Sequence, residues 1–198
     1  MAVSSWACPQ KIQPFERTGR VSMDKPTVRS SAPTDGAEPE FDPRDLRNAL
    51  GCFATGVTII TAAGPGDVQV GLTANSFSSV SLNPALVSWS LASHAPSMPI
   101  FQDCSHYAIH VLSRQQQELA IRFSQPRDDK FDGLKIQPGL GNAPIIPDAL
   151  ATFQCHNAYR HAGGDHVIFL GAVEKYDHTE GEPLVFHQGQ FTDLAPTK

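Results

Sequence analysis

The chain has 198 residues, of which 40% are hydrophobic and 18% are charged, and its formal net charge is −5. This length suits one domain of ordinary size, and its apolar residues can fill a core without forming a run long enough to span a bilayer. The acidic balance argues against a nucleic-acid binder, which needs a clustered basic face to neutralise phosphates. We therefore expect a globular protein that binds neither membranes nor nucleic acids.

Residues 1–40 are rich in Pro, Ser, Thr and Gly, and their five basic residues balance five acidic ones. Little in this segment could bury a core, so we predict a flexible N-terminal arm followed by one domain over residues 41–198. Met23 leaves open whether translation starts there or at Met1.

The four cysteines lie far apart and form no CxxC pair, which argues against a zinc ribbon and against a disulfide scaffold. They are Cys8, Cys52, Cys104 and Cys155. The N-terminus has no apolar stretch of signal-peptide length. We expect reduced thiols and a cytoplasmic protein.

The first predicted element of the domain is a helix that Asp42 caps and Pro43 begins. Leu46, Leu50 and Phe53 give it an apolar stripe, and Gly51 ends it. The β-branched run 57–61 predicts a strand, the Gly-Pro-Gly-Asp sequence at 64–67 a turn, and residues 68–73 a second strand. The two strands should pair as a hairpin.

Further along the chain, short strands alternate with Gly, Pro, Asn and Asp punctuation. We predict strands at 78–82, 86–91, 107–112, 151–159, 167–176 and 184–186. One helix interrupts them, because Ser113 and Gln116 match a capping box and apolar residues follow at helical spacing. No βαβ alternation is present, so a Rossmann domain is excluded and a mainly β fold is expected.

Residues 71–84 combine hydroxyl and amide side chains with small residues and almost no charge. These groups and the backbone N–H groups could hydrogen-bond a polar planar ligand without burying charge. The alternative is a Ser-rich loop with ordinary turn bonds.

His166 follows Gly163, Gly164 and Asp165 in a turn that leads into an apolar strand, so its imidazole could enter a cleft. A structural histidine is the alternative. We expect Asp165 to shape the turn and not to orient His166, because neighbouring strand residues point to opposite faces.

His106 and His110 have a spacing that would suit zinc on a helix. Apolar residues alternate with them, however, so the segment is predicted to be a strand, and no acidic third ligand accompanies them. We expect no metal site. A Ser/His/Asp hydrolase is also unsupported, because no Gly-x-Ser-x-Gly elbow occurs.

Residues 54–61, 71–81 and 164–166, in this order and spacing, resemble the short-chain flavin reductase family. The resemblance extends over residues 41–194. It implies a split β-barrel of Greek-key type with a few short helices, and a homodimer with flavin near the subunit interface. Members of this family supply reduced flavin to partner monooxygenases.

The resemblance also implies site residues. Gly71, Leu72, Thr73 and Ala74 would line the isoalloxazine ring, and Asn75 and Ser76 would add polar contacts. Ser90, Leu91, Ala92, Ser93 and Ser97 would lie along the flavin tail, with N–H groups of a short helix near Pro96 holding phosphate. Arg122 and Lys130 are candidate phosphate partners, the alternative being plain surface cations.

His166 would lie near the flavin and the incoming nicotinamide in such an enzyme. The resemblance thus implies an NAD(P)H:flavin oxidoreductase that uses FMN, with FAD possible, and NADH or NADPH. Residues 93–97 are the most variable part of the resemblance, so the choice between FMN and FAD stays open. Ala85 and His110 depart from the family pattern without removing a proposed flavin contact. The alternatives are a non-enzymatic flavin carrier and an oxidase of the pyridoxamine-phosphate type.

Overall fold

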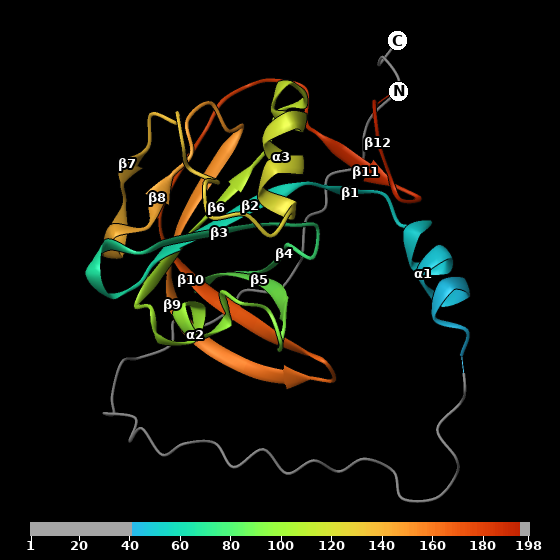
Figure 1. The fold of residues 1–198 in the computed structure, drawn as a ribbon, viewed down its shortest axis with the longest axis horizontal. Helices are drawn as coiled ribbons and strands as arrows, with labels where there is room; N and C mark the ends of the chain where they lie inside the picture. Colours follow the sequence, from blue (N-terminus) through green and yellow to red (C-terminus); the bar gives the residue numbers. More distant parts are fainter. Residues whose placement is uncertain (1–40, 195–198) are drawn as a thin grey trace, which may run out of the picture. The chain divides into compact units, whose positions relative to one another are not determined.

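The computed structural model describes residues 41–194, and Figure 1 shows their fold. The flexible arm expected over residues 1–40, with Met23 and Cys8, lies outside the described residues, as do residues 195–198. The described cysteines Cys52, Cys104 and Cys155 are all free thiols, as expected. Within the described range, no helix has both the length and the apolar character that crossing a membrane requires.

The structure is mainly β with a few short helices, which confirms the predicted class. The helices are α1 (Pro43–Gly51), α2 (Met98–Asp103) and α3 (Gln117–Ser124). The first six strands are β1 (Thr55–Gly56), β2 (Thr58–Ala63), β3 (Gln69–Ala74), β4 (Ser78–Leu82), β5 (Ala85–Ala92) and β6 (His106–Val111). The others are β7 (Gln137–Pro138), β8 (Pro144–Ile145), β9 (Ala151–Gly163), β10 (His166–His178), β11 (Val185–His187) and β12 (Gln190–Thr192).

Local sequence signals explain two of the predicted helices, α1 and α3. Asp42 accepts a hydrogen bond from the Arg44 N–H at 2.8 Å, and Pro43 occupies the first turn of α1. Ser113 and Gln116 form the predicted capping box at the start of the helical segment that continues into α3. The predicted strand at 57–61 begins one residue later, because the Val57 N–H bonds Leu184 O outside β2.

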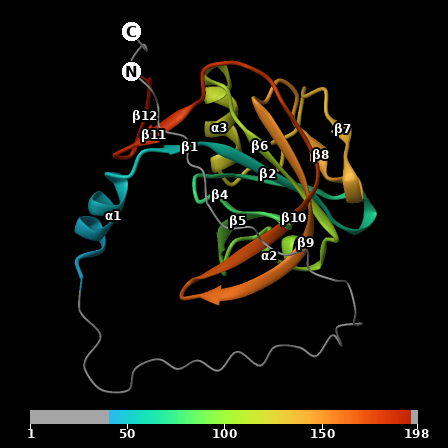
Figure 2. The same cartoon turned by 180° about the vertical axis from the view of Figure 1, so that it is seen from behind.

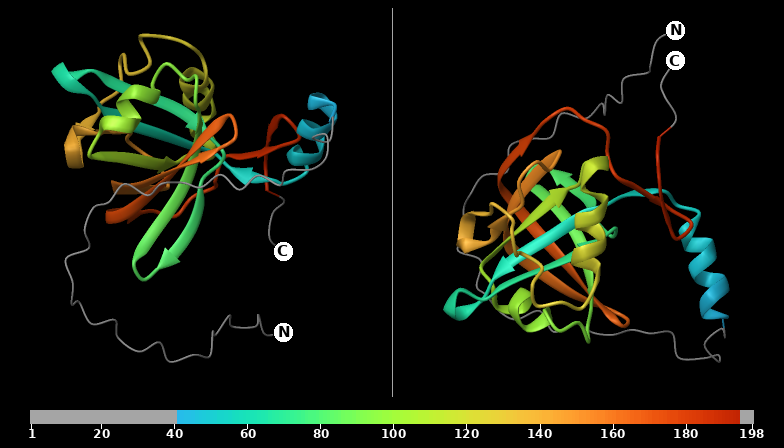
Figure 3. Two further views of the ribbon diagram at one scale, coloured as in Figure 1. Left: turned by 90° about the horizontal axis from the view of Figure 1, so that it is seen from below. Right: turned by 45° about the horizontal axis from the view of Figure 1, so that its top comes forward.

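Seven antiparallel strands form the main sheet in the order β3-β2-β6-β9-β10-β5-β4. The predicted hairpin of β2 with β3 is present, and β4 with β5 and β9 with β10 form two more. The β9–β10 hairpin lies between β5 and β6, which are consecutive in the chain, and this insertion gives the Greek-key order. Figure 2 shows the strands from behind, and in Figure 3 they curve around a common interior. The fold is the predicted split barrel.

Two groups of buried side chains fill this fold. The larger centres on Trp89, whose indole stacks on Phe169 with ring centroids 4.6 Å apart and meets Phe101 and Tyr107 edge-on. The smaller includes Phe123 of α3 together with Ile59 and Leu112. Because Phe123 is fully buried there, α3 is fixed against the sheet, and so is the chain that follows it.

The apolar stripe of α1 does not pack as a core-facing stripe would. Leu46, Leu50 and Phe53 are 44%, 68% and 79% exposed, and within the described residues α1 has no buried side chain. In the single chain these apolar side chains therefore face solvent.

Candidate functional site

A cavity of about 750 Å³ lies between β3, the segment that leads into α2 and the segment that follows α3. Six of the residues predicted from the sequence line it: Gly71, Leu72, Thr73, Leu91, Ser97 and Lys130. Three separate parts of the chain thus meet at one place, and the cavity is our candidate site.

Gly71 allows α3 and the segment after it to lie directly against β3. A Cβ atom at this position would stand 2.5 Å from Phe123 Cε1 and 3.1 Å from Phe131 Cζ, closer than packed atoms come. Thr73 adds a tie on the same strand, since its hydroxyl donates to the Ala120 carbonyl at 2.6 Å. The wall of the cavity therefore depends on the missing side chain at Gly71.

Lys130 presents a cation at this wall. Its ammonium group donates to the carbonyl oxygens of Gly71 and Phe123, both at 3.0 Å, and partial burial lowers the pKa of the Lys130 amine. An ammonium has three N–H donors, so one remains for a ligand after these two bonds.

Of the two arginines near the cavity, the one that lines it is Arg127 and not Arg122, the predicted phosphate partner. Arg122 does not line the cavity, and its guanidinium donates to the carbonyl oxygens of Asp129 and Asp132, which fixes the loop after α3. Arg127 does line the cavity and makes two hydrogen bonds to the Asp129 carboxylate, at 2.8 and 2.6 Å. These bonds lower the pKa of the Asp129 carboxyl. Sequence reasoning missed Arg127, because a lone arginine in a loop carries no pattern.

Ser97 lines the cavity at the residue before α2. Within the described part of the chain its side chain makes no capping bond to the helix, so the hydroxyl is available to a ligand. The expected N–H groups are fewer than predicted: the Met98 N–H donates to Ala95 O at 2.9 Å, and Pro99 has no N–H. The hydroxyl is therefore the clearer polar feature of this corner.

A second set of predicted residues lies outside the cavity lining, at the ends of β3 and β5: Ala74, Asn75, Ser76, Ser90, Ala92 and Ser93. Here the Ser76 hydroxyl accepts the Ser90 N–H at 3.0 Å and donates to Ser90 O at 3.2 Å. This pair ties the loop after β3 to β5, so the Ser76 hydroxyl already has partners within the fold.

His166 begins β10 opposite Ala92, beside this second set and outside the cavity lining. Its Nδ1 lies 2.7 Å from the Asp165 carboxylate, which lowers the pKa of the Asp165 carboxyl, and its side chain is 43% exposed. The expectation that Asp165 would point away was wrong. Strand alternation does not apply, because Asp165 belongs to the turn that Gly164 forms with φ of +68°.

The same turn is joined to the segment that leads into the cavity. The Ser93 N–H donates to the Asp165 carbonyl at 2.9 Å, and four residues later Ser97 lines the cavity. The short segment from Ser93 to Ser97 therefore connects the turn before His166 with the cavity lining.

His110 is a structural histidine. It lies in strand β6, as predicted, where its Nδ1 donates to Ile59 O at 3.0 Å and its Nε2 accepts the Ile146 N–H at 3.1 Å. Burial lowers the pKa of its imidazole to about 4, so the ring is neutral. Both ring nitrogens are used, and His110 is not half of a metal motif with His106.

Comparison with known proteins gives consistent matches along the described domain. The family described as "Flavin reductase like domain" matches residues 50–195. The FMN reductase (NADH) SmoA of Agrobacterium fabrum is 45% identical over 148 residues, covering 75% of this chain and 84% of that protein. The reductase subunit HsaB of a flavin-dependent monooxygenase from Mycobacterium tuberculosis is 35% identical over 162 residues, covering 80% and 86%.

Solved structures agree with the sequence matches. Flavin reductase PheA2 in its native state superposes with a TM-score of 0.71 at 39% identity, covering 79% of this chain and all (100%) of that one. The NADH:FAD oxidoreductase SgcE6 of Streptomyces globisporus, in complex with NAD and FAD fragments, gives 0.74 at 35% identity, covering 80% and 98%. The similarity therefore extends through the whole barrel.

Proposed function

The chain belongs to the flavin reductase-like domain family, and from this premise we propose how its own residues serve the reaction. The protein is an NAD(P)H:flavin oxidoreductase and a reductase component for a flavin-dependent monooxygenase. The observation that carries the site assignment is the cavity of about 750 Å³ at which residues 71–73, Leu91, Ser97 and Lys130 meet.

The residues of the cavity fit a flavin. Its volume lies in the range of small-molecule sites, and Leu72, Leu91 and Phe131 offer apolar surface for a flat ring. The Ser97 hydroxyl and the third N–H of the Lys130 ammonium are donors of the kind that bind a phosphate. These two residues would hold the phosphate of FMN, or the same group within FAD.

The second set reaches the flavin only if the ligand extends beyond the cavity over the ends of β3 and β5. In this proposal Ala74 and Ala92 leave room for the ligand, while Asn75, Ser90 and Ser93 offer polar groups to its exposed edge. Arg122 acts indirectly, by fixing the loop that carries Lys130.

The bound flavin supplies the hydride-accepting chemistry, with the reduced nicotinamide as donor. The protein must then hold donor and acceptor about 3–3.5 Å apart in a fixed orientation. We assign the donor side to His166. The Asp165 carboxylate engages Nδ1, which leaves Nε2 to meet the nicotinamide carboxamide.

The proposed assembly is a homodimer. One chain leaves Leu46, Leu50 and Phe53 exposed on and just after α1, and a second copy would bury them. Burying each such side chain contributes about 1.5–3 kcal/mol. We further propose that residues 41–198 form the whole flavin-binding domain, after the arm, and that the protein works in the cytoplasm.

A variant of His166 tests the reductase against the flavin-carrier alternative, which would use the same cavity without a nicotinamide side. With FMN and NADH, His166→Ala should lower the rate of NADH oxidation about tenfold or more while its flavin dissociation constant stays within about twofold. His161→Ala, an exposed histidine of β9, is the matched control and should match the wild type. Equal rates for His166→Ala and the wild type would remove His166 from the mechanism.

The same assay, repeated with NADPH, FAD and riboflavin, measures cofactor preference. If the wild type neither binds nor reduces any of these flavins, the assigned function fails.

A further inference from the structure

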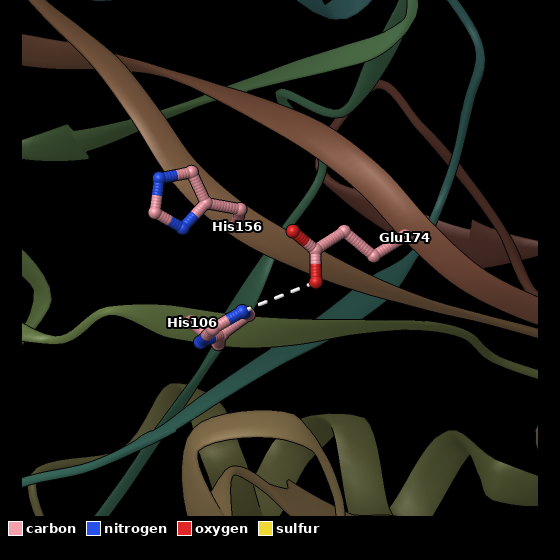
Figure 4. Close-up of side chains that lie close together, drawn as sticks. All are labelled: His106, His156 and Glu174. Carbon is pink, nitrogen blue, oxygen red and sulfur yellow. Dashed lines mark hydrogen bonds and ion pairs between the residues drawn. The ribbon is translucent and has the colours of Figure 1, made fainter.

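His106, His156 and Glu174 point toward one another from neighbouring strands (Figure 4), and none of them lines the cavity. Each offers one ligand atom, and the three atoms lie within 4.8 Å of one another. We call these three residues the His–Glu cluster. From its geometry we infer that it is a binding site for a divalent transition-metal cation such as Zn²⁺.

The sheet register brings the cluster together from three neighbouring strands. His106 of β6 lies directly opposite His156 of β9, and His156 lies opposite Ala172 of β10. Between Val173 and Lys175 the register of β10 shifts, so Glu174 has no partner residue in β9. A bulge of this kind changes the direction of a side chain, and here the Glu174 carboxylate faces both imidazoles.

The donor set suits zinc. Two imidazole nitrogens and one carboxylate oxygen form the His₂Glu set of open zinc sites, which leave a fourth position for water or a ligand. Metal–ligand bonds of about 2.0–2.2 Å place tetrahedral ligand atoms roughly 3.3–3.5 Å apart. His106 Nε2 already lies 3.3 Å from Glu174 Oε2. The exposed His156 side chain can approach by rotating about its χ angles.

The surroundings orient His106 for this role. Its Nδ1 lies 3.0 Å from the Ser105 hydroxyl, which can accept an Nδ1–H and so leave the Nε2 lone pair for a metal. A Cβ on Gly141 would lie 2.9 Å from His106 Cβ, so the 140–142 turn packs closely against this residue. The His106 side chain is 22% exposed, compared with 49% for Glu174.

A simple ion pair would need only His106 and Glu174. The second histidine distinguishes the cluster, because within residues 41–194 the His156 side chain forms no hydrogen bond and its ring centroid lies 5.3 Å from that of His106. The sequence prediction of no metal considered the spacing of His106 and His110 within one strand. It could not detect ligands contributed by three strands.

The test is calorimetric titration of the metal-stripped, flavin-loaded full chain with Zn²⁺. Wild type should bind one Zn²⁺ per chain at this site. His156→Ala and Glu174→Gln should each weaken that binding by more than about tenfold, since even outer-shell partners of a ligand are worth 10–100-fold in affinity. His161→Ala, which removes an exposed histidine from the same strand outside the cluster, should bind like the wild type.

Thermal unfolding gives a second readout. Zn²⁺ should raise the Tm of the wild type and of His161→Ala, and leave that of His156→Ala unchanged, because a ligand of the native state stabilises it. Unaltered flavin binding in every variant would show that each one folds. If His156→Ala and His161→Ala bind Zn²⁺ equally, or if the wild type takes up only scattered weak ions, the inference is overturned.

Discussion

Three histidines illustrate how neighbours set the role of a side chain at the scale of single residues. His110 is buried and uses both ring nitrogens in hydrogen bonds, His166 is half exposed beside a carboxylate, and His106 faces a second imidazole and Glu174. All three histidines are named in the sequence analysis. Only for His166 does the local sequence, Gly-Gly-Asp before the histidine, indicate a role in the site. The partners of the others come from distant strands, which local spacing does not reveal.

His110 predicts an acid sensitivity of stability. Its pKa is about 4 in the folded protein against an ordinary 6.5, so the unfolded chain takes up this proton first as the pH falls. The stabilisation is complete above pH 6.5 and declines between 6.5 and about 4, by roughly 1.4 kcal/mol per pH unit. Urea unfolding at several pH values measures it.

Other groups also titrate in acid, so the comparison is with His110→Gln, which removes the imidazole. The free energy of unfolding of the wild type should fall more steeply over this window than that of His110→Gln. Parallel pH profiles would show that His110 is not the buried neutral histidine described above.

At the scale of elements, the contact of α3 with β3 shapes the cavity wall. Gly71→Ala should destabilise the fold by about 1–3 kcal/mol, because the added methyl meets the Phe123 ring, and should weaken flavin binding. Gly56→Ala is the matched control in β1, since nothing lies within 4 Å of a Cβ there. Denaturant unfolding and flavin titration of both variants check this, and equal stabilities would contradict it.

Elements with strong local signals were predicted well. The Asp42 cap, the capping box at Ser113 and the β2–β3 hairpin all appear as expected. The prediction failed where such signals are missing. β9 and β10 continue to Gly163 and His178 through largely exposed residues that lack alternation. β7, β8 and β12 have only two or three residues each, too few for an alternating pattern to show.

The site shows the same division. Residues that form one continuous motif, such as Gly71 to Thr73, were predicted as site residues, and they line the cavity. Arg127 and Phe131 reach the cavity only because Phe123 fixes α3 on the sheet, and the bend of Asp165 toward His166 depends on a turn conformation. These relations are set by tertiary packing and could not be predicted from composition.

At the scale of the whole molecule, the exposed apolar residues on and just after α1 predict a dimer. The double variant Leu50→Ser/Phe53→Ser should shift the protein from dimer to monomer in light scattering, because it removes apolar surface that a second copy would bury. Asn48 lies on the opposite side of the helix from Leu46, so the control variant Asn48→Ala should remain dimeric. A monomeric wild type, or a double variant that stays dimeric, would exclude this assembly.

The proposed function depends most on hydride transfer to a flavin held by this barrel. The direct measurement is anaerobic mixing of NADH with the purified, FMN-saturated protein while the flavin absorbance is followed. We expect the oxidised flavin band to disappear within the turnover time, at a rate that rises with NADH concentration and saturates. A flavin that stays oxidised in the presence of NADH and NADPH would contradict the proposed function.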